Sequence, residues 1–366
     1  MSQKYPYQAP LPRLSVGDPE LTRPDWTAGV LRDPKLLWLD KNENTDPELA
    51  AVTSTLLREI SISEIYTYPE ITPCYQKLAN FLDISPDHLI FTPGSDGVIR
   101  AVFEAYVSPG DIIIHTAPTF AMYPVYSLMY GAKAISLEYQ FSENGPSLAV
   151  ETFVKAILEV HPKLVCLPNP DSPTGTVFSP DNLRRIIEAA GQAGALMLVD
   201  EAYHPFYKET AISWVKEYPH LVIARTFAKA WGLAGLRIGY AVASPEVANN
   251  LHKVRPMYEV NTVAVAVINR MLDFNHEVLQ SVKRLNEGKD FFLETMRELG
   301  FTTLKTYGNF LHVSFGKQAQ AIHEVLKKVV LYRLDFKESC LKGFSRFSAT
   351  TRDQFKPIIE CIEKAL

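Results

Sequence analysis

The chain contains few cysteines. Four are present among 366 residues, at positions 74, 166, 340 and 361, and they are widely separated. None forms a C-x-x-C pair and none has the spacing from histidine that zinc ligands show, so the sequence predicts no metal site and no disulfide framework. Isolated thiols are typical of a reducing compartment, and we therefore expect the protein to be cytoplasmic.

Long apolar runs and a strong charge imbalance are also lacking. No run is long enough to cross a bilayer, and the Pro-rich N-terminus has no apolar segment typical of a signal peptide. The formal net charge is only −4, which gives no electrostatic reason to expect nucleic acid or an anionic membrane as a partner. Small molecules are the expected binding partners.

Apolar residues are abundant, at 47% of the chain, which is enough for the cores of two domains. Buried strands are predicted at five short apolar runs: 88–92, 111–115, 164–167, 196–199 and 221–224. A helix begins after Ser179, with Pro180 in its first turn, and separates two of these strands. Strands that alternate with helices predict an α/β fold with a mostly parallel sheet.

The two ends of the chain have different patterns. Residues 1–36 are Pro-rich with little periodicity and read as an extended N-terminal arm. Toward the C-terminus, strands at 310–315 and 344–348 alternate with helical segments. This part predicts a smaller α+β domain.

One lysine, Lys229, stands where an apolar strand ends and a Gly-rich segment begins. Ligands of open α/β sheets bind at that edge of the sheet. The strand at 196–199 leads into Asp200 and Tyr203, while Thr226 and Arg237 flank the lysine. A buried ion pair of Asp200 with Lys229 is the plain alternative, but it leaves the phenol, the hydroxyl and the guanidinium without a role.

A pyridoxal 5'-phosphate site uses all five groups. The aldehyde of this cofactor condenses with a lysine amine, and an acidic partner keeps its ring nitrogen protonated, so that the ring withdraws electrons. A guanidinium and a hydroxyl suit the phosphate. The sequence therefore predicts this cofactor, with Lys229, Asp200 and Tyr203 as catalytic residues and Thr226 and Arg237 as phosphate ligands.

These motifs, D-E-A-Y at 200–203, T-x-x-K at 226–229 and Arg237, resemble the fold-type I, class I/II aminotransferases, and among them the histidinol-phosphate aminotransferase branch. The resemblance extends from about Leu39 onward. It implies the fold of that family, with a large cofactor-binding domain at 46–255 whose mostly parallel sheet is flanked by helices. A smaller α+β domain is expected from 37–45 and 256–366, after the arm at 1–36.

The resemblance implies further cofactor contacts. Gly94, Ser95 and Asp96 open a helix and match the phosphate-binding segment of the family. Phe120 holds the position of the aromatic ring that stacks on the cofactor. Tyr68 matches a tyrosine that reaches the cofactor phosphate of the other subunit, so a homodimer with shared active sites is expected.

The segment P-N-P-D-S-P-T-G at 168–175 resembles the family's N-P-T-G segment, whose asparagine binds the ring oxygen of the cofactor. It reads as a lengthened version of that segment, so two residues are candidates for the contact. We favour Asn169, with Ser172 as the alternative. Asp171 has a simpler interpretation as part of a turn.

Three residues are candidates for substrate binding. Arg346 matches the arginine that binds the substrate's carboxylate or phosphate in relatives, and a planar guanidinium suits either anion. A solvated strand residue is the alternative interpretation of Arg346. Asn309 lies just before the same domain's first strand, and Asn44 lies in the L-D-K-N-E-N segment that enters the site in relatives.

The predicted function is that of an aminotransferase. We expect it to move an amino group between an amino acid, glutamate by resemblance, and a small phosphorylated keto or amino compound. Thr45, Asp46 and Ala228 depart from the family pattern near the site, which argues against histidinol phosphate itself. The alternatives are histidinol-phosphate aminotransferase proper, a decarboxylase of a phosphorylated amino acid, and a non-enzymatic protein that retains the cofactor fold.

Overall fold

The computed structural model describes residues 10–22 and 31–366. Residues 1–9 and 23–30, which belong to the predicted arm, lie outside the described part. The described part of the arm packs on its own chain at the end of α5 (Met122–Met129). Ser15 Oγ donates a hydrogen bond to the carbonyl of Met129 at 2.9 Å, and Arg13 lies over the ring of Tyr130 at 5.2 Å.

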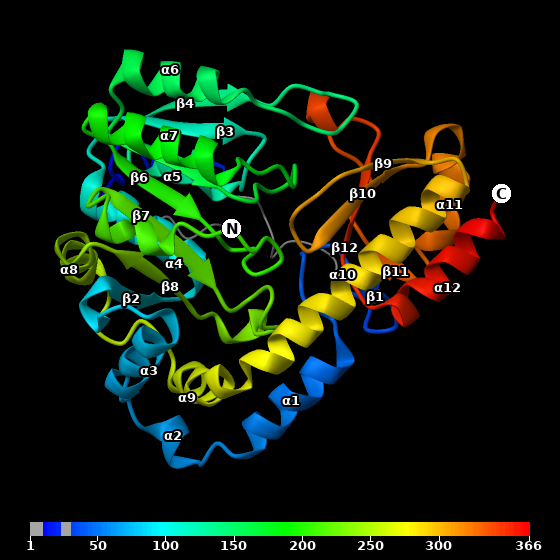
Figure 1. Ribbon diagram of the computed structural model, residues 1–366, viewed down its shortest axis with the longest axis horizontal. Helices are drawn as coiled ribbons and strands as arrows, with labels where there is room; N and C mark the ends of the chain where they lie inside the picture. Colours follow the sequence, from blue (N-terminus) through cyan, green and yellow to red (C-terminus); the bar gives the residue numbers. More distant parts are fainter. Residues whose placement is uncertain (1–9, 23–30) are drawn as a thin grey trace, which may run out of the picture.

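A seven-stranded sheet forms the centre of the larger part of the molecule (Figure 1). Its strands, in spatial order, are β2 (Leu89–Thr92), β8 (Gly239–Ala243), β7 (Leu221–Thr226), β6 (Leu196–Asp200), β5 (Leu164–Pro168), β3 (Ile112–Ala117) and β4 (Lys133–Glu138). Every neighbouring pair is parallel except the two that β8 forms with β7 and β2. The predicted α/β class with a mostly parallel sheet is confirmed.

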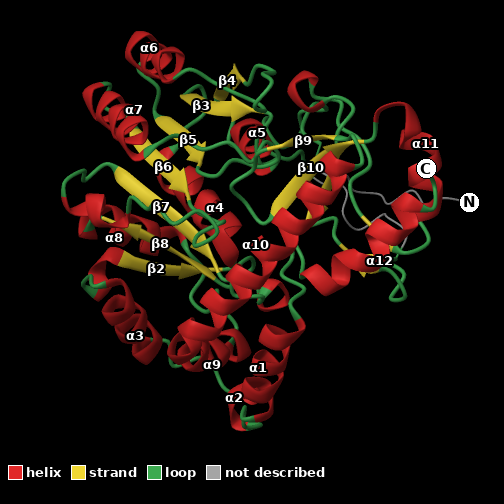
Figure 2. Ribbon diagram, turned by 45° about the vertical axis from the view of Figure 1, so that its right-hand side comes forward, coloured by secondary structure: helices red, strands yellow, loops and turns green. Residues whose placement is uncertain are grey.

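Helices cover both faces of this sheet (Figure 2). One face carries α4 (Gly94–Tyr106), α5 and α8 (Pro245–Val254). The other carries α3 (Thr72–Leu82), α6 (Val150–Val160), α7 (Pro180–Gln192) and α9 (Thr262–Met271), with α1 (Pro47–Arg58) beside α9 and α2 (Ser63–Tyr66) at the edge.

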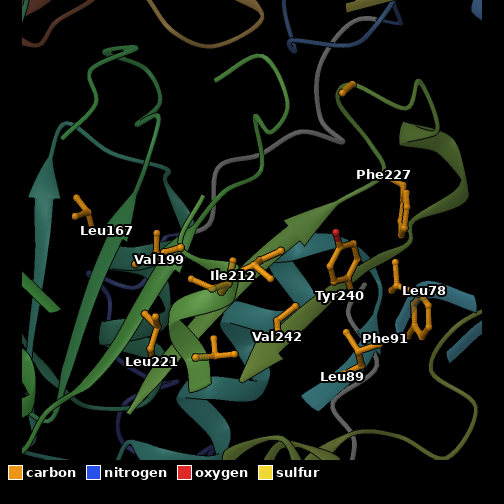
Figure 3. Packing of buried hydrophobic residues seen from close by; sticks show 14 of the residues in the cluster. Leu78, Leu89, Phe91, Leu167, Val199, Ile212, Leu221, Phe227, Tyr240 and Val242 are labelled. Atoms are coloured by element: carbon orange, nitrogen blue, oxygen red, sulfur yellow. The ribbon is translucent and has the colours of Figure 1, made fainter. Parts of the chain in front are cut away.

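Side chains of the central strands alternate between the two faces. On β6, Met197 and Val199 face α7, whereas Leu198 faces the core that contains α4 and α5. Figure 3 shows the core on the side of α7, in which Leu167, Val199 and Val242 lie on one side of the sheet. Because both faces are covered, these strands are apolar throughout, which is why the sequence reveals them.

The carboxyl ends of β5, β6 and β7 lie side by side. Pro168 of β5 is paired with Asp200 of β6, and Asp200 is paired with Ala224 of β7. The segments that follow these strands, 169–175, 201–203 and 227–229, therefore begin at one edge of the sheet. This arrangement brings together motifs that are up to 60 residues apart in sequence.

The C-terminal part forms a second, smaller unit. Its sheet has the order β12 (Ser345–Ser348), β10 (Phe310–Ser314), β9 (Thr302–Leu304), and a separate pair joins β1 (Leu37–Trp38) to β11 (Val330–Leu331). Three helices pack on them: α10 (Asn275–Glu298), α11 (Ala319–Leu326) and α12 (Arg352–Glu363). In Figure 1 the blue β1 lies among these orange and red elements, so the segment after the arm joins the C-terminal unit.

The core of this unit begins later in the chain than the predicted boundary at 256. The buried side chains from Val260 to Val282, which include α9 and the start of α10, pack with the large sheet. Side chains of α10 enter the C-terminal core from Phe292 onward. The reason is that α10 is long enough to run from one unit to the other, as Figure 1 shows.

Six short 3₁₀ helices complete the described part: η1 (Pro86–His88), η2 (Ile212–Lys216), η3 (Ala234–Leu236), η4 (Leu272–Phe274), η5 (Gly316–Gln318) and η6 (Ser339–Leu341). No helix of the described residues has the length and apolar character needed to span a bilayer.

Asp46 joins α1 to α10 close to the interface of the two units. Its carboxylate caps α1 by accepting a hydrogen bond from Glu48 N at 3.2 Å, and it pairs with Arg284 at 2.6 Å. The side chain of Asp46 is fully buried, while that of Arg284 is 23% exposed. One carboxylate therefore both starts a helix and fixes that helix against its neighbour.

Replacing Asp46 by Ala should lower the free energy of unfolding by about 2 to 3 kcal/mol, of which about 1 kcal/mol is the lost helix cap. Asp46→Asn is the matched control, because asparagine caps helices well but carries no charge. It should cost about half as much. Urea denaturation followed by circular dichroism measures both, and equal losses would contradict the division between cap and ion pair.

Candidate active site

Lys229 lies in the turn after β7, with its side chain directed between the two units. Its Nζ donates a hydrogen bond to the carbonyl of Lys41 at 2.8 Å and lies 5.9 Å from the centre of the Tyr203 ring. Burial, followed by the positive charge of Arg346, lowers the pKa of Lys229 to about 8. At pH 7 this pKa leaves about a tenth of the amine neutral and nucleophilic, far more than for an ordinary lysine.

Asp200 ends β6 and is 5% exposed. It accepts hydrogen bonds from Ala202 N at 2.9 Å and from Tyr123 OH at 3.3 Å. Burial raises the pKa of Asp200 to about 7, and no cation of the described residues lies within ion-pair distance to oppose it. The two charges of the predicted set, Asp200 and Lys229, are thus near one another without forming the ion pair that was the alternative interpretation.

Tyr203 lies between the two units. Its hydroxyl accepts a hydrogen bond from Asn42 Nδ2 at 2.9 Å, and its ring meets that of Phe310 edge to face at 5.3 Å. Burial raises the pKa of Tyr203, while the charge of Arg346 and hydrogen bonds with Ser172 and Asn42 oppose the rise. The phenol therefore stays protonated and can donate a hydrogen bond to a group in the site.

Arg346 comes from β12 and faces the same space. Its Nη2 donates to the carbonyl of Asp40 at 2.9 Å, and its guanidinium lies over Phe310 at 5.6 Å. Burial lowers the pKa of Arg346 to about 10, which leaves the group charged at neutral pH. At 9% exposure Arg346 is a buried cation, and its alternative interpretation as a solvated strand residue is wrong.

Buried polar atoms without partners gather around this space. Asn42 Oδ1, Asn309 Oδ1 and Arg346 Nε are buried and have no hydrogen-bond partner. Buried polar groups are nearly always paired in proteins, so such a cluster marks a place built for a polar ligand. Asn309 also donates to the carbonyl of Asn42 at 2.9 Å, which ties the cluster together.

The predicted phosphate site lies at the start of α4. Gly94 opens this helix at φ 78°, and a Cβ there would lie 3.0 Å from Arg237 Nη2. Nη2 of Arg237 also donates to the carbonyl of Pro93 at 3.4 Å. No side chain caps the helix, so its free N–H groups and the guanidinium can share one anion.

Three more predicted phosphate residues border this helix start. Ser95 and Asp96 occupy the first turn of α4, and Tyr126 OH donates to Asp96 at 3.1 Å. Thr226 ends β7, and its hydroxyl accepts a hydrogen bond from Ala228 N at 3.1 Å. Together with Gly94 and Arg237 they surround the first turn of α4.

Two predicted site residues have other partners. The amide of Asn169 exchanges hydrogen bonds with the backbone of Phe178, at 2.8 and 3.3 Å, while Ser172 is the residue that lies at the Tyr203 hydroxyl. This geometry favours Ser172 over Asn169 for the contact with the ring oxygen. Asn44 donates to the carbonyl of Ala230 and to Ser281 Oγ, both at 3.0 Å, so it supports the lysine turn from behind.

The aromatic residues of the predicted set occupy different surroundings. Phe120 is half-buried in the loop after β3 and meets Tyr123 edge to face at 6.2 Å. Tyr68 lies on the surface, 70% exposed, and stacks on Tyr258 at 4.0 Å. Tyr68 is thus largely exposed on this chain, as is Arg237.

Two residues that contribute to the site were not predicted. Tyr123 OH donates to Asp200, and Asn42 donates to Tyr203 OH through its side chain and to Ser348 Oγ of the C-terminal unit through its backbone N–H. Tyr123 stands three residues after Phe120 in the same segment, a signal that would have suggested it. Asn42 adopts a left-handed φ of 56°, which asparagine tolerates better than most residues, but nothing in the sequence separates it from Asn44.

The donors and charges fit pyridoxal 5'-phosphate. Asp200 suits its protonated ring nitrogen, Tyr203 and Ser172 suit its ring oxygen, and Lys229 suits its aldehyde. The first turn of α4, with Arg237 beside it, suits its phosphate. Among the described residues no group of three His, Cys, Asp or Glu side chains could hold a metal ion. The fold and this site define a cofactor-dependent enzyme of the fold-type I transferases.

Residues 34–362 match the family of class I and II aminotransferases, and the chain belongs to this family. It is 30% identical over 333 residues to the histidinol-phosphate aminotransferase of Thermoanaerobacter sp. (strain X514), a match that covers 90% of this chain and 92% of that protein. The corresponding protein of Caldicellulosiruptor saccharolyticus is 32% identical over 303 residues, with coverage of 81% and 82%.

Solved structures have the same fold. The histidinol-phosphate aminotransferase of Sinorhizobium meliloti in complex with pyridoxal-5'-phosphate has a TM-score of 0.76, at 20% identity over 90% of each chain. The aspartate aminotransferase of Thermus thermophilus with maleate has a TM-score of 0.75, at 21% identity over 91% and 92% of the two chains. The protein is a pyridoxal-phosphate-dependent aminotransferase similar to histidinol-phosphate aminotransferases.

The pKa of Lys229 gives a measurable pH dependence. Covalent capture of pyridoxal phosphate by the cofactor-free protein needs the neutral amine, so its rate should rise with pH, with a midpoint near 8. The positive charge of Arg346 lowers this pKa, so Arg346→Gln should move the midpoint upward. Stopped-flow absorbance of the bound cofactor measures both rates.

The control for this experiment is Arg352→Gln. Arg352 begins α12 and lies over Phe291 at 4.3 Å, and its charge is not among the causes of the Lys229 shift. The midpoint should stay where it is in the wild type. An unchanged or lower midpoint in Arg346→Gln would contradict the electrostatic link between Arg346 and Lys229.

Proposed function

We propose that this aminotransferase moves an amino group between glutamate and a small phosphorylated keto or amino compound. The observation that carries the proposal is a pair of adjacent arginines. Arg333 and Arg346 exchange two backbone hydrogen bonds, at 3.0 and 2.8 Å, so their side chains leave the same face of the C-terminal unit.

The charges of Arg333 and Arg346 both affect one buried side chain, that of His312. Burial lowers the pKa of His312 well below its usual value, and the charges of Arg346 and Arg333 lower it further. The guanidinium of Arg333 stacks on Phe336 at 3.8 Å, and that ring also contacts His312. Arg333 is also paired with Glu338 at 3.4 Å, so a phosphate that takes the place of this carboxylate would be held by two guanidiniums, whereas a carboxylate needs one.

The relatives named histidinol-phosphate aminotransferase make histidinol phosphate the second candidate substrate. Two features argue for a smaller compound. Thr45 bonds Thr350 at 2.8 Å, and Asp46 pairs with Arg284, so both residues serve contacts between the units instead of forming an aromatic wall for an imidazole. A three-carbon phosphorylated compound needs no such wall.

Each catalytic side chain has one role in the proposed reaction. Bound pyridoxal phosphate withdraws electrons from the substrate carbon. Lys229, whose pKa of about 8 suits a base near neutral pH, would remove the proton from that carbon. The resulting ammonium group would then donate the proton to the carbon that gains the amino group. Asp200 holds the proton of the ring nitrogen, Tyr203 donates a hydrogen bond to the ring oxygen, and Arg346 holds the anionic end of the substrate.

The first test is an absorption spectrum of the purified protein with pyridoxal phosphate, before and after L-glutamate is added. Glutamate should convert the bound cofactor to its amino form without release of carbon dioxide. Lys229→Ala should abolish turnover, while Lys253→Ala, an exposed lysine of α8, should not. Release of carbon dioxide without a requirement for a keto acid would replace the proposal with decarboxylation.

A comparison of amino donors tests the substrate class. With 2-oxoglutarate as acceptor, kcat/KM should be higher for three-carbon phosphorylated amines than for histidinol phosphate, and lowest for the same amines without phosphate. Arg333→Gln should raise KM for the phosphorylated donors about tenfold and change KM for glutamate little. A higher kcat/KM for histidinol phosphate would make that compound the substrate.

We also propose a homodimer with shared active sites. Large apolar side chains are exposed around Tyr68, which is 70% exposed: Ile62 at 71%, Ile65 at 60%, Tyr66 at 74%, Met257 at 81% and Tyr258 at 51%. A patch of this kind is typical of a protein interface. Tyr68 lies within it, which suits a residue that serves the site of a second copy.

Light scattering after gel filtration should give twice the mass of 41.1 kDa for the wild type. Ile62→Glu with Ile65→Glu should give monomers, because two carboxylates at an apolar contact are costly to bury. Tyr68→Phe should remain dimeric but bind pyridoxal phosphate about tenfold more weakly, through loss of one hydrogen bond to a charged group. A monomeric wild type would contradict the shared site.

A further inference from the structure

Asp171 is a buried carboxylate that the roles described above do not use. It is completely inaccessible to solvent, and no cation of the described residues forms an ion pair with it. Burial raises the pKa of Asp171 to about 7, although its hydrogen bonds oppose the rise. Burying a carboxylate is costly, and an amide of the same shape would fill this position at lower cost.

Four donors bind this one carboxylate. Oδ1 accepts hydrogen bonds from Thr119 Oγ1 at 2.9 Å and from Ser172 N at 2.8 Å. Oδ2 accepts from Thr116 Oγ1 at 2.5 Å and from Tyr139 OH at 3.1 Å. Thr116 and Thr119 belong to β3 and the loop after it, Tyr139 follows β4, and Ser172 is the next residue in the chain, so the carboxylate links its own loop to two other segments.

The two oxygens bind different parts of the structure. Oδ1 joins the loop that carries Phe120, next to Thr119, to the loop in which Ser172 lies at the Tyr203 hydroxyl. Oδ2 anchors this junction to Thr116, which belongs to β3, and to Tyr139, which packs with Phe336 of the C-terminal unit. Oδ1 therefore connects the Phe120 loop to the Ser172 loop. Oδ2 connects both loops to β3 and to Tyr139.

We propose that Asp171 is a positioning residue of the aminotransferase. It holds the Phe120 loop and the Ser172 loop at a fixed separation, so that Phe120 contacts the face of the cofactor ring while Ser172 contacts its oxygen-bearing edge. The inference rests on the proposed cofactor contacts of Phe120 and Ser172, and it is independent of which substrate is used. Because these two contacts are already in place, less conformational entropy is lost when the cofactor binds.

The test compares four variants with the wild type. Asp171→Ala removes all four hydrogen bonds. Asp171→Asn keeps the shape, because its Oδ1 can accept from Thr119 and Ser172 N while its amide donates to the hydroxyls of Thr116 and Tyr139. Thr119→Val removes only the bond to the Phe120 loop, and Tyr139→Phe removes only a bond on the side away from the cofactor loops.

The measurements are the affinity of the cofactor-free protein for pyridoxal phosphate by tryptophan fluorescence, the absorption and circular dichroism of the bound cofactor, and the melting temperature without cofactor. We expect Asp171→Ala to weaken affinity about 10- to 100-fold and Thr119→Val about 5- to 10-fold, both with reduced circular dichroism of the cofactor. Asp171→Asn should restore affinity to within about threefold of the wild type, and Tyr139→Phe should change it by less than that.

A purely structural role gives a different pattern. Thr119→Val and Tyr139→Phe would then lower the melting temperature alike and leave the cofactor signals unchanged, and this result would overturn the proposal. Equal affinity of Asp171→Ala and the wild type would also overturn it. Covalent capture of pyridoxal phosphate by the wild type and the absence of this covalent bond in Lys229→Ala are measured first, so failure of the cofactor assignment is distinguished from failure of this inference.

Discussion

The central constraint in this protein is electrostatic. Asp200 is a carboxylate at the end of a strand that is apolar on both faces, and it is buried without a cation of the described residues to pair with it. Lys229, on the neighbouring strand's turn, is bound to a backbone carbonyl instead. Asp200 and Lys229 do not neutralise each other. Asp200 is therefore available to a protonated nitrogen of a ligand, and Lys229 to an electrophilic carbon of the same ligand.

The two structural units depend on each other for this site. The large sheet supplies Asp200, Tyr203 and Lys229, whereas the C-terminal unit supplies Arg346 and Asn309. The short segment 40–42 lies between them and bonds to both. Its backbone carbonyls accept hydrogen bonds from Lys229, Arg346 and Asn309, and its asparagine donates to Tyr203. The site is therefore a property of the assembled chain and not of either unit alone.

Much of the fold could be predicted because the central strands are buried on both faces and read as apolar runs. The strands that were not predicted lack this signal. β4 is an edge strand with exposed Lys133 and Glu138, and β8 begins at Gly239, directly after the Gly-rich segment that follows Lys229. Between the two predicted C-terminal strands, α11 ends at Leu326 and the short strand β11 follows at Val330.

The sequence likewise reveals some residues of the site and not others. Lys229, Asp200 and Tyr203 could be found because they stand at the ends of recognisable strands. Asn42 could not, since its bond to Tyr203 joins residues 161 positions apart, and a left-handed backbone turn decides that its amide, and not that of Asn44, points into the site. The choice between Asn169 and Ser172 also depended on a contact outside the motif, the backbone of Phe178.

The hydrogen bonds of segment 40–42 have a consequence for how this enzyme tolerates variation. Lys229 and Arg346 are oriented by the main-chain carbonyls of Lys41 and Asp40, not by the side chains of those residues. A carbonyl is present whatever the side chain is, so the identity of residue 41, which is exposed, is free to change while the lysine keeps its acceptor. The direction of the backbone at Asn42 is not free in this way. Substitutions that alter the path of the chain here act on two units at once, whereas the side chain at position 41 can change while Lys229 and Arg346 keep their acceptors.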